Sequence, residues 1–106
     1  MSAAAAKRPD GETREVFRWM NEQVQRVQNG WPTTAYDLIC ECGDVDCLRV
    51  LTLDRQTYDR IAREPLQFVV LPGHERPEFE EIVQRQSTFV VVRPRHLSAA
   101  AERGTP

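Results

Sequence analysis

The spacing of apolar residues changes along the chain, and these changes define the elements that we expect. From Glu12 onward, apolar side chains recur with the period of a helix and form one stripe about 100° wide. We expect this stripe to cover a sheet. Asp10 or Thr13 is expected to cap the start of the helix, and Asn29-Gly30 followed by Pro32 to end it. The stripe consists of Val16, Phe17, Met20, Val24 and Val27.

The rest of the chain shows strand patterns that one further helix interrupts. Residues 35–42 and 47–51 are typical of two strands joined by a polar turn at residues 43–46. Thr52 is a suitable N-cap for a short helix over residues 53–63, which Pro65 would end. Three more strands are expected at residues 66–71, 81–85 and 88–93. The predicted fold class is α+β, with a mainly antiparallel sheet and the order helix, two-stranded Cys hairpin, short helix, three strands.

The composition predicts one small domain between two tails. Of the 106 residues, 41% are apolar, but most of the alanines fall near the ends of the chain. We expect a single domain over residues 12–95, with disordered tails at residues 1–11 and 96–106. Neither a membrane span nor a signal peptide is recognisable, so the expected location is cytoplasmic.

The charge balance argues against nucleic acid as a partner. Fourteen basic and sixteen acidic side chains leave a net charge of −2. Proteins that bind the phosphate backbone are normally basic, because each neutralised phosphate needs a nearby cation. The sequence identifies no small-molecule substrate, and we expect an unknown protein partner.

Three cysteines and a histidine form the pattern with the clearest chemistry. Cys40, Cys42 and Cys47 precede His74 with the spacing C-x-C-x4-C-x26-H. Side chains two apart on a strand share a face, and a turn at residues 43–46 would bring Cys47 back to them. Three Cys and one His form one of the closed tetrahedral sites of Zn²⁺. We therefore predict a zinc site with His74 as the fourth ligand. Alternative fourth ligands are His96, Asp44 and Asp46.

Two other interpretations of the cysteines remain open. They can be inert buried thiols, although the intervening Glu41 and the polar turn are not typical of a core segment. Alternatively, Cys42 and Cys47 can form a disulfide across the turn, as in a redox switch. Clustered thiols in a reducing compartment more often bind metal or carry redox chemistry than cross-link the chain.

The cysteine pattern belongs to a longer series of motifs. These are a Cys-x-Cys turn with a third cysteine, Leu-Thr-Leu and a tyrosine, Phe-Val-Val, Pro-Gly-His and a closing aromatic-Val-Val-Val strand. The series resembles a family of small, largely uncharacterised bacterial proteins and covers residues 38–93, although Phe89 and Arg93 stand where the resemblance implies tyrosine and lysine. It implies a zinc-binding domain and no particular activity. Besides the four candidate ligands, the matching positions are 51–53, Tyr58, Arg63, Pro65, 68–70, Pro72, Gly73, Val83 and 89–92.

These observations favour a non-enzymatic role. No phosphate-binding glycine loop, nucleophile elbow or H-E-x-x-H motif is present. We expect a small zinc-stabilised binding or regulatory module that acts through protein contacts. The alternatives are a thiol-based redox sensor that releases zinc on oxidation and a metal-dependent enzyme with an open zinc site. Trp19, with Arg14, Arg18 and Arg26 nearby, is a candidate docking surface.

Overall fold

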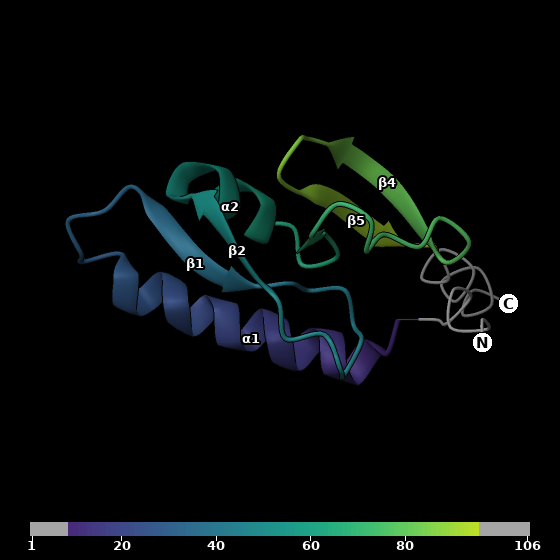
Figure 1. The fold of residues 1–106 in the computed structure, drawn as a ribbon. Helices are drawn as coiled ribbons and strands as arrows, with labels where there is room; N and C mark the ends of the chain where they lie inside the picture. The colour runs from purple at the N-terminus through teal and green to yellow at the C-terminus, as the bar shows by residue number, and fades with distance from the viewer. Residues whose placement is uncertain (1–8, 96–106) are drawn as a thin grey trace, which may run out of the picture.

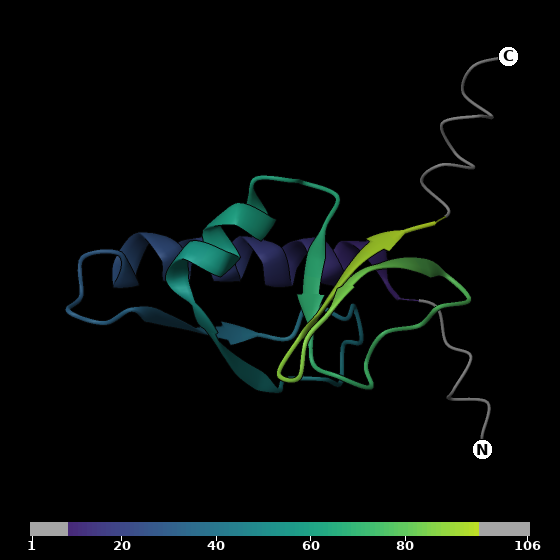
Figure 2. The same cartoon turned by 90° about the horizontal axis from the view of Figure 1, so that it is seen from above.

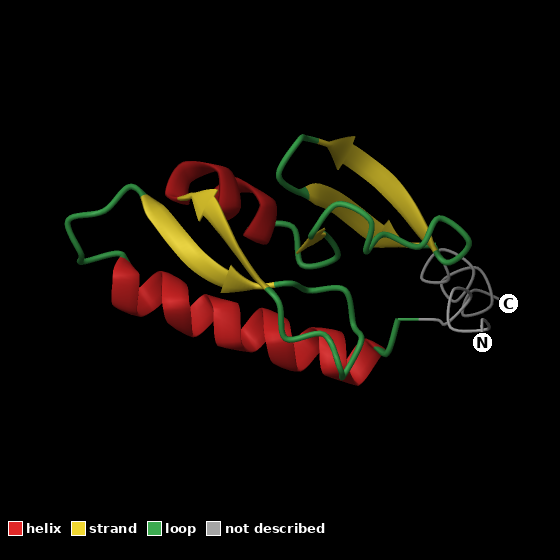
Figure 3. Cartoon of the chain, in the orientation of Figure 1, coloured by secondary structure: helices red, strands yellow, loops and turns green. Residues whose placement is uncertain are grey.

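Two helices and two small antiparallel sheets make up the fold (Figures 1 and 3). The computed structural model describes residues 9–95. The predicted tails lie outside these residues, apart from residues 9–11, which include the start of the first helix. The α+β class and the order of the elements are confirmed. In chain order the elements are α1 (Gly11–Gln28), β1 (Ala35–Ile39), β2 (Val50–Asp54), α2 (Arg55–Ala62), β3 (Phe68–Val70), β4 (Glu80–Arg85) and β5 (Val90–Pro94).

The five strands form two separate sheets. β1 and β2 are antiparallel, and Tyr36 and Leu38 lie opposite Leu53 and Leu51 on one buried face. The second sheet has the order β3-β5-β4, with β5 paired to both neighbours. The β4–β5 hairpin lies at the end of the molecule where α1 begins (Figures 1 and 2). Among residues 9–95, no helix has the length and hydropathy needed to cross a membrane.

The face that α1 buries coincides only in part with the predicted apolar stripe. Asp10 caps the helix, as one of the two predicted candidates, and accepts a hydrogen bond from the Glu12 amide at 3.0 Å. Val16 and Val27, however, are 53% and 57% exposed. Of the stripe, Phe17 is buried and Val24 packs against the core. The stripe prediction was therefore wrong for the two exposed valines. The buried residues of α1 are Arg14, Phe17, Arg18 and Asn21.

The polar face of α1 has partners that the helical period does not reveal. Asn21 donates to the Ile39 carbonyl and accepts from the Ile39 amide, both at 2.8 Å. Its side chain thereby substitutes for a neighbouring strand at the free edge of β1. Gln28 accepts from the Asp37 amide of the same strand at 3.2 Å. α1 therefore covers a backbone edge as well as apolar side chains, which explains why it buries polar residues.

The second strand and the second helix begin later than predicted. The prediction placed a strand at residues 47–51 and the helix cap at Thr52, but β2 runs over Val50–Asp54 and contains Thr52. Asp54 caps α2 instead and accepts from the Thr57 amide at 3.1 Å. The shift follows from burial, because Leu51 and Leu53 must both face the core. In α2, Tyr58 and Ile61 face the core as predicted.

Candidate metal centre

The cysteine segment leaves β1 and crosses to the second sheet before it turns. The Cys40 amide donates to the Arg49 carbonyl and the Glu41 amide donates to the Val69 carbonyl, both at 2.9 Å. A turn closed by the Cys47 amide and the Asp44 carbonyl, at 2.9 Å, then reverses the chain. Gly43 has a φ of 83°, a conformation that favours glycine. The polar sequence after Cys42 therefore forms the predicted turn.

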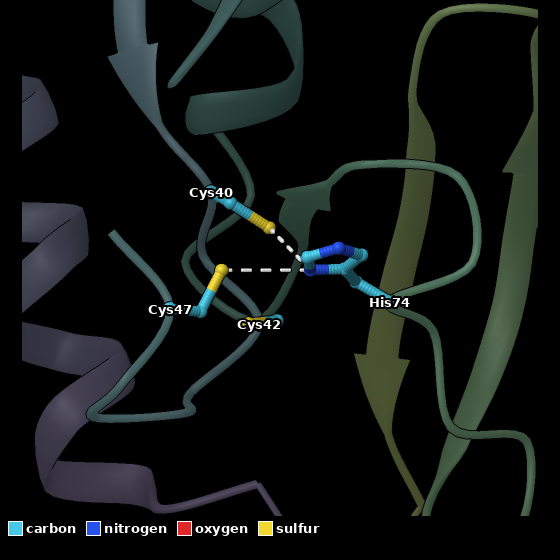
Figure 4. Close-up of side chains that lie close together, drawn as sticks. All are labelled: Cys40, Cys42, Cys47 and His74. Carbon is cyan, nitrogen blue, oxygen red and sulfur yellow. Dashed lines mark hydrogen bonds between the residues drawn. The ribbon is translucent and has the colours of Figure 1, made fainter. Parts of the chain in front are cut away.

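The loop after β3 carries His74. The His74 amide donates to the Leu71 carbonyl at 2.9 Å, and Gly73 has a φ of 92°. Glu75 supports the turn, because it accepts from the Gly73 amide at 2.8 Å and pairs with Arg85 at 2.5 Å. The tight turn directs the imidazole toward the cysteine segment (Figure 4).

The four predicted ligand residues come together in the folded chain. Their ligand atoms all lie within 4.8 Å of one another, although His74 is far from the cysteines in sequence. Nδ1 of His74 lies 3.6 Å from Sγ of Cys40 and 3.5 Å from Sγ of Cys47 (Figure 4). A tetrahedral zinc ion with ordinary Zn–S and Zn–N bonds separates its sulfur and nitrogen ligands by about 3.5 Å. The arrangement therefore has the dimensions of a Cys3His metal site.

Each of the three sulfurs accepts a hydrogen bond from a backbone amide. The Leu71 amide donates to Sγ of Cys40 at 3.3 Å. The Asp44 amide donates to Sγ of Cys42, and the Arg49 amide donates to Sγ of Cys47. Such bonds stabilise thiolates and orient them, as is typical of the surroundings of metal ligands.

The thiols influence one another strongly. The hydrogen bond from the Cys40 thiol lowers the pKa of Cys42 to about 4. Donating that bond, together with burial, raises the pKa of Cys40. Burial also raises the pKa of Cys47. Burial and the hydrogen bonds between the thiols therefore move the pKa values of the three cysteines apart.

The alternative fourth ligands are not part of this cluster. The group of potential metal ligands found among residues 9–95 contains neither Asp44 nor Asp46. The Asp44 carboxylate accepts from the Asp46 amide at 2.9 Å and lies 3.8 Å from the guanidinium of Arg76. His96 lies outside the described residues. Of the candidate fourth ligands that the structure describes, His74 is the one whose ring nitrogen lies beside the cysteine sulfurs.

Glu41 is an important residue of the site that the sequence analysis misread. Its polar character predicts that the segment is not part of the core, yet Glu41, Cys40 and Cys42 are fully buried. Its Oε2 accepts from Arg18, Asn21 and Tyr58 at 3.2, 2.8 and 2.7 Å. Its Oε1 accepts from the Val69 amide at 2.9 Å. Alternation on an extended segment sends Glu41 toward α1, and it sends the two flanking cysteines toward His74.

A second buried ion pair joins α1 to the start of β4, which follows the histidine loop. Arg14 pairs with Glu80 at 2.8 Å and donates through Nε to the Glu41 carbonyl at 2.8 Å. Glu80 in turn accepts from the Arg76 amide at 2.8 Å, and Arg76 donates to the His74 carbonyl at 3.0 Å. The sequence signal for this network is the spacing of Arg14, Arg18 and Asn21 on one helical face, which the apolar stripe obscured.

The predicted docking surface on α1 needs correction. Trp19 is 59% exposed. Arg14 and Arg18, however, are buried and engaged with Glu80 and Glu41, so they are not available at the surface as predicted.

Comparisons of this chain with protein-family models, curated proteins and solved structures find no match. The resemblance to a bacterial family therefore stays a prediction, and the geometry of the site carries the functional argument.

Proposed function

We propose that Cys40, Cys42, Cys47 and His74 bind one structural Zn²⁺ ion. The observation that carries this proposal is the pair of sulfur–nitrogen separations, 3.5 and 3.6 Å, inside a group whose ligand atoms lie within 4.8 Å. Three thiolates and an imidazole are soft and borderline ligands, which suit zinc and do not suit calcium or magnesium. Iron–sulfur clusters more often have four cysteine ligands.

The proposed role of the ion is to stabilise the fold and not to perform chemistry. Four protein ligands complete the tetrahedral shell of zinc, whereas catalytic sites usually keep one position open. Structural zinc contributes on the order of 10 kcal/mol, which is comparable with the whole stability of a small domain. This supports a non-enzymatic module over an enzyme with an open zinc site.

We propose that the module acts through protein contacts, and the loop that carries Cys47 supports this. Three large apolar side chains near that cysteine in the sequence are strongly exposed: Val45 and Leu48 in the loop, at 61 and 68%, and Val50 at the start of β2, at 61%. Exposed apolar side chains that gather in one segment are typical of interaction surfaces. Because the metal shapes this loop, the proposed surface depends on the metal.

The decisive experiment measures metal content and the role of the histidine. Elemental analysis of the purified protein is expected to find one zinc per chain. His74→Ala should lower zinc retention against a competing chelator strongly, whereas His96→Ala should leave it unchanged. His74→Cys should restore retention, because four cysteines also form a structural zinc site. Equal losses in the two alanine variants would remove His74 from the site.

One observation favours a redox sensor as a second candidate function. All three sulfurs are free and lie within 4.8 Å of one another, so two of them can form a disulfide after a small movement. Hydrogen peroxide would take two electrons from two thiolates, and with two protons it would form one disulfide and two water molecules. Zinc release together with disulfide formation at low peroxide supports the sensor. Zinc that stays bound supports the structural module.

A further inference from the structure

A cavity unrelated to the metal ligands lies beside α1. Its volume is about 470 Å³, within the range of about 300–1,000 Å³ that small-molecule sites occupy. Its lining is mainly apolar. Trp19 and Leu66 line it and remain 59% and 47% exposed, so they are accessible to a ligand. The walls come from α1, the connection between α2 and β3, and the ends of the second sheet. Its apolar lining includes Trp19, Leu66, Phe68 and Phe79.

Arg18, one of the residues that line this cavity, carries a hydrogen-bond donor without a partner in the described part of the chain. The residue lines the cavity and is only 7% exposed. Its Nε donates to Glu41 at 3.2 Å, and its guanidinium lies 4.8 Å from the centre of the Phe68 ring. Its Nη2 is buried and has no hydrogen-bond partner among the described residues. A buried donor without a partner is costly, particularly on a charged group, so an acceptor beside it would be stabilising.

Glu41 cannot easily supply that acceptor. Its Oε2 already accepts from Arg18, Asn21 and Tyr58, and its Oε1 accepts from the Val69 amide. The charge of Arg18 is thus compensated through one hydrogen bond to an oxygen that two other donors share. An additional carboxylate would satisfy the guanidinium, which presents five donors in a plane.

We propose that this cavity binds a small organic carboxylate with a flat apolar body, whose oxygen accepts a hydrogen bond from Nη2 of Arg18. The apolar body lies against Phe68, Trp19 and Leu66. A volume of about 470 Å³ suits a molecule of one or two rings. This site is separate from the proposed zinc site, and its test uses the zinc-loaded protein.

The two tryptophans of the chain provide a direct test. Trp19 lines the cavity and Trp31, which is 51% exposed, does not. In ¹H–¹⁵N NMR spectra of the full chain, we expect naphthoate to shift the indole N–H signal of Trp19 in a saturable way and to leave that of Trp31 in place. Naphthamide has the same ring system without the charge. It should bind about tenfold more weakly, because its neutral carbonyl forms a weaker hydrogen bond with the guanidinium than a carboxylate does.

Variants assign the contacts. Leu66→Ala should weaken the binding of naphthoate, whereas Val27→Ala, an exposed valine of α1 outside the cavity, should not. Arg18→Gln should remove the preference for naphthoate over naphthamide. If that variant does not fold, the ratio of the affinities for naphthoate and naphthamide in the unchanged protein tests whether the carboxylate is recognised. Equal affinities, no saturable shift at millimolar naphthoate, or equal shifts of both tryptophans would overturn the proposal.

Discussion

Glu41 occupies a position between two proposed metal ligands and points away from them. Four donors converge on its carboxylate, from α1, α2 and β3. A buried carboxylate needs such a complete set of partners, because the loss of water around its charge is otherwise not compensated. Glu41 therefore fixes the backbone of the Cys-Glu-Cys segment from the side opposite to the metal. It is a positioning residue of the site.

Removal of this charge should destabilise the protein strongly. Glu41→Gln leaves Arg18 without a counter-ion and turns one accepting oxygen into a donor that faces other donors. Breaking a buried pair typically costs about 3–5 kcal/mol. Urea unfolding of the zinc-loaded protein measures the loss.

The matched control for this substitution lies on the surface. Glu81 pairs with Arg93 at 2.9 Å, but both side chains are about half exposed. Exposed pairs contribute at most about 1 kcal/mol, so Glu81→Gln should change stability little. A similar loss in both variants would contradict the structural role of Glu41.

At the scale of elements, α1 and the cysteine turn hold each other in place. The Asp10 amide, at the cap of α1, donates to the Gly43 carbonyl at 2.9 Å. A Cβ atom at Gly43 would lie 3.0 Å from Cβ of Pro9 and 3.1 Å from the Asp10 nitrogen. The turn can therefore approach the helix this closely only with glycine at that position.

A series of glycine substitutions tests this contact. Gly43→Ala combines a positive φ with close contacts. It should therefore lower the free energy of unfolding by more than the roughly 1–2 kcal/mol that a left-handed conformation alone costs. Gly73→Ala has a positive φ but open space, so it should cost about that amount. Gly30→Ala has neither and should be nearly neutral. Urea unfolding is expected to give this order, and an equal cost for Gly43→Ala and Gly30→Ala would contradict it.

At the scale of the whole molecule, the proposed zinc ion joins two sheets that are not parts of one ladder. β1–β2 and β3-β5-β4 are separate sheets. Between them, Glu41 makes two hydrogen bonds to Val69, and the Arg14–Glu80 pair connects the two sides. The proposed ion adds ligands from both sides, because the cysteines follow β1 and precede β2 whereas His74 follows β3. Its removal should weaken the junction between the sheets first.

Hydrogen exchange after metal removal checks this expectation. With a strong chelator, amides of β3 and of residues 71–76 should exchange faster, and loss of the native circular dichroism signal should follow if the metal contributes most of the net stability. The centre of α1 should remain protected longer. Unchanged exchange and circular dichroism after complete metal removal would contradict a structural metal.

The sequence by itself determined the types and order of the elements and the residues that are chemically suited to bind a metal. Both depend on local information, namely the period of apolar residues, the caps and turns, and the ligand chemistry of cysteine and histidine. The start of β2 at Val50 was missed, because the inward orientation of Leu51 and Leu53 depends on their partners in β1.

Only the tertiary structure decided which surfaces and side chains meet. It placed His74 against the sulfurs, and it buried Arg14 and Arg18 in place of Val16 and Val27. It also made Glu41 the centre of a polar network. The partners of Glu41 lie 17 to 28 residues away in sequence, and Glu80 lies 66 residues from Arg14. The periodic pattern in the sequence shows that a residue is polar. It does not show whether a partner far away in the sequence neutralises the charge of that residue and so allows its burial. The burial of these residues therefore depended on the folded chain.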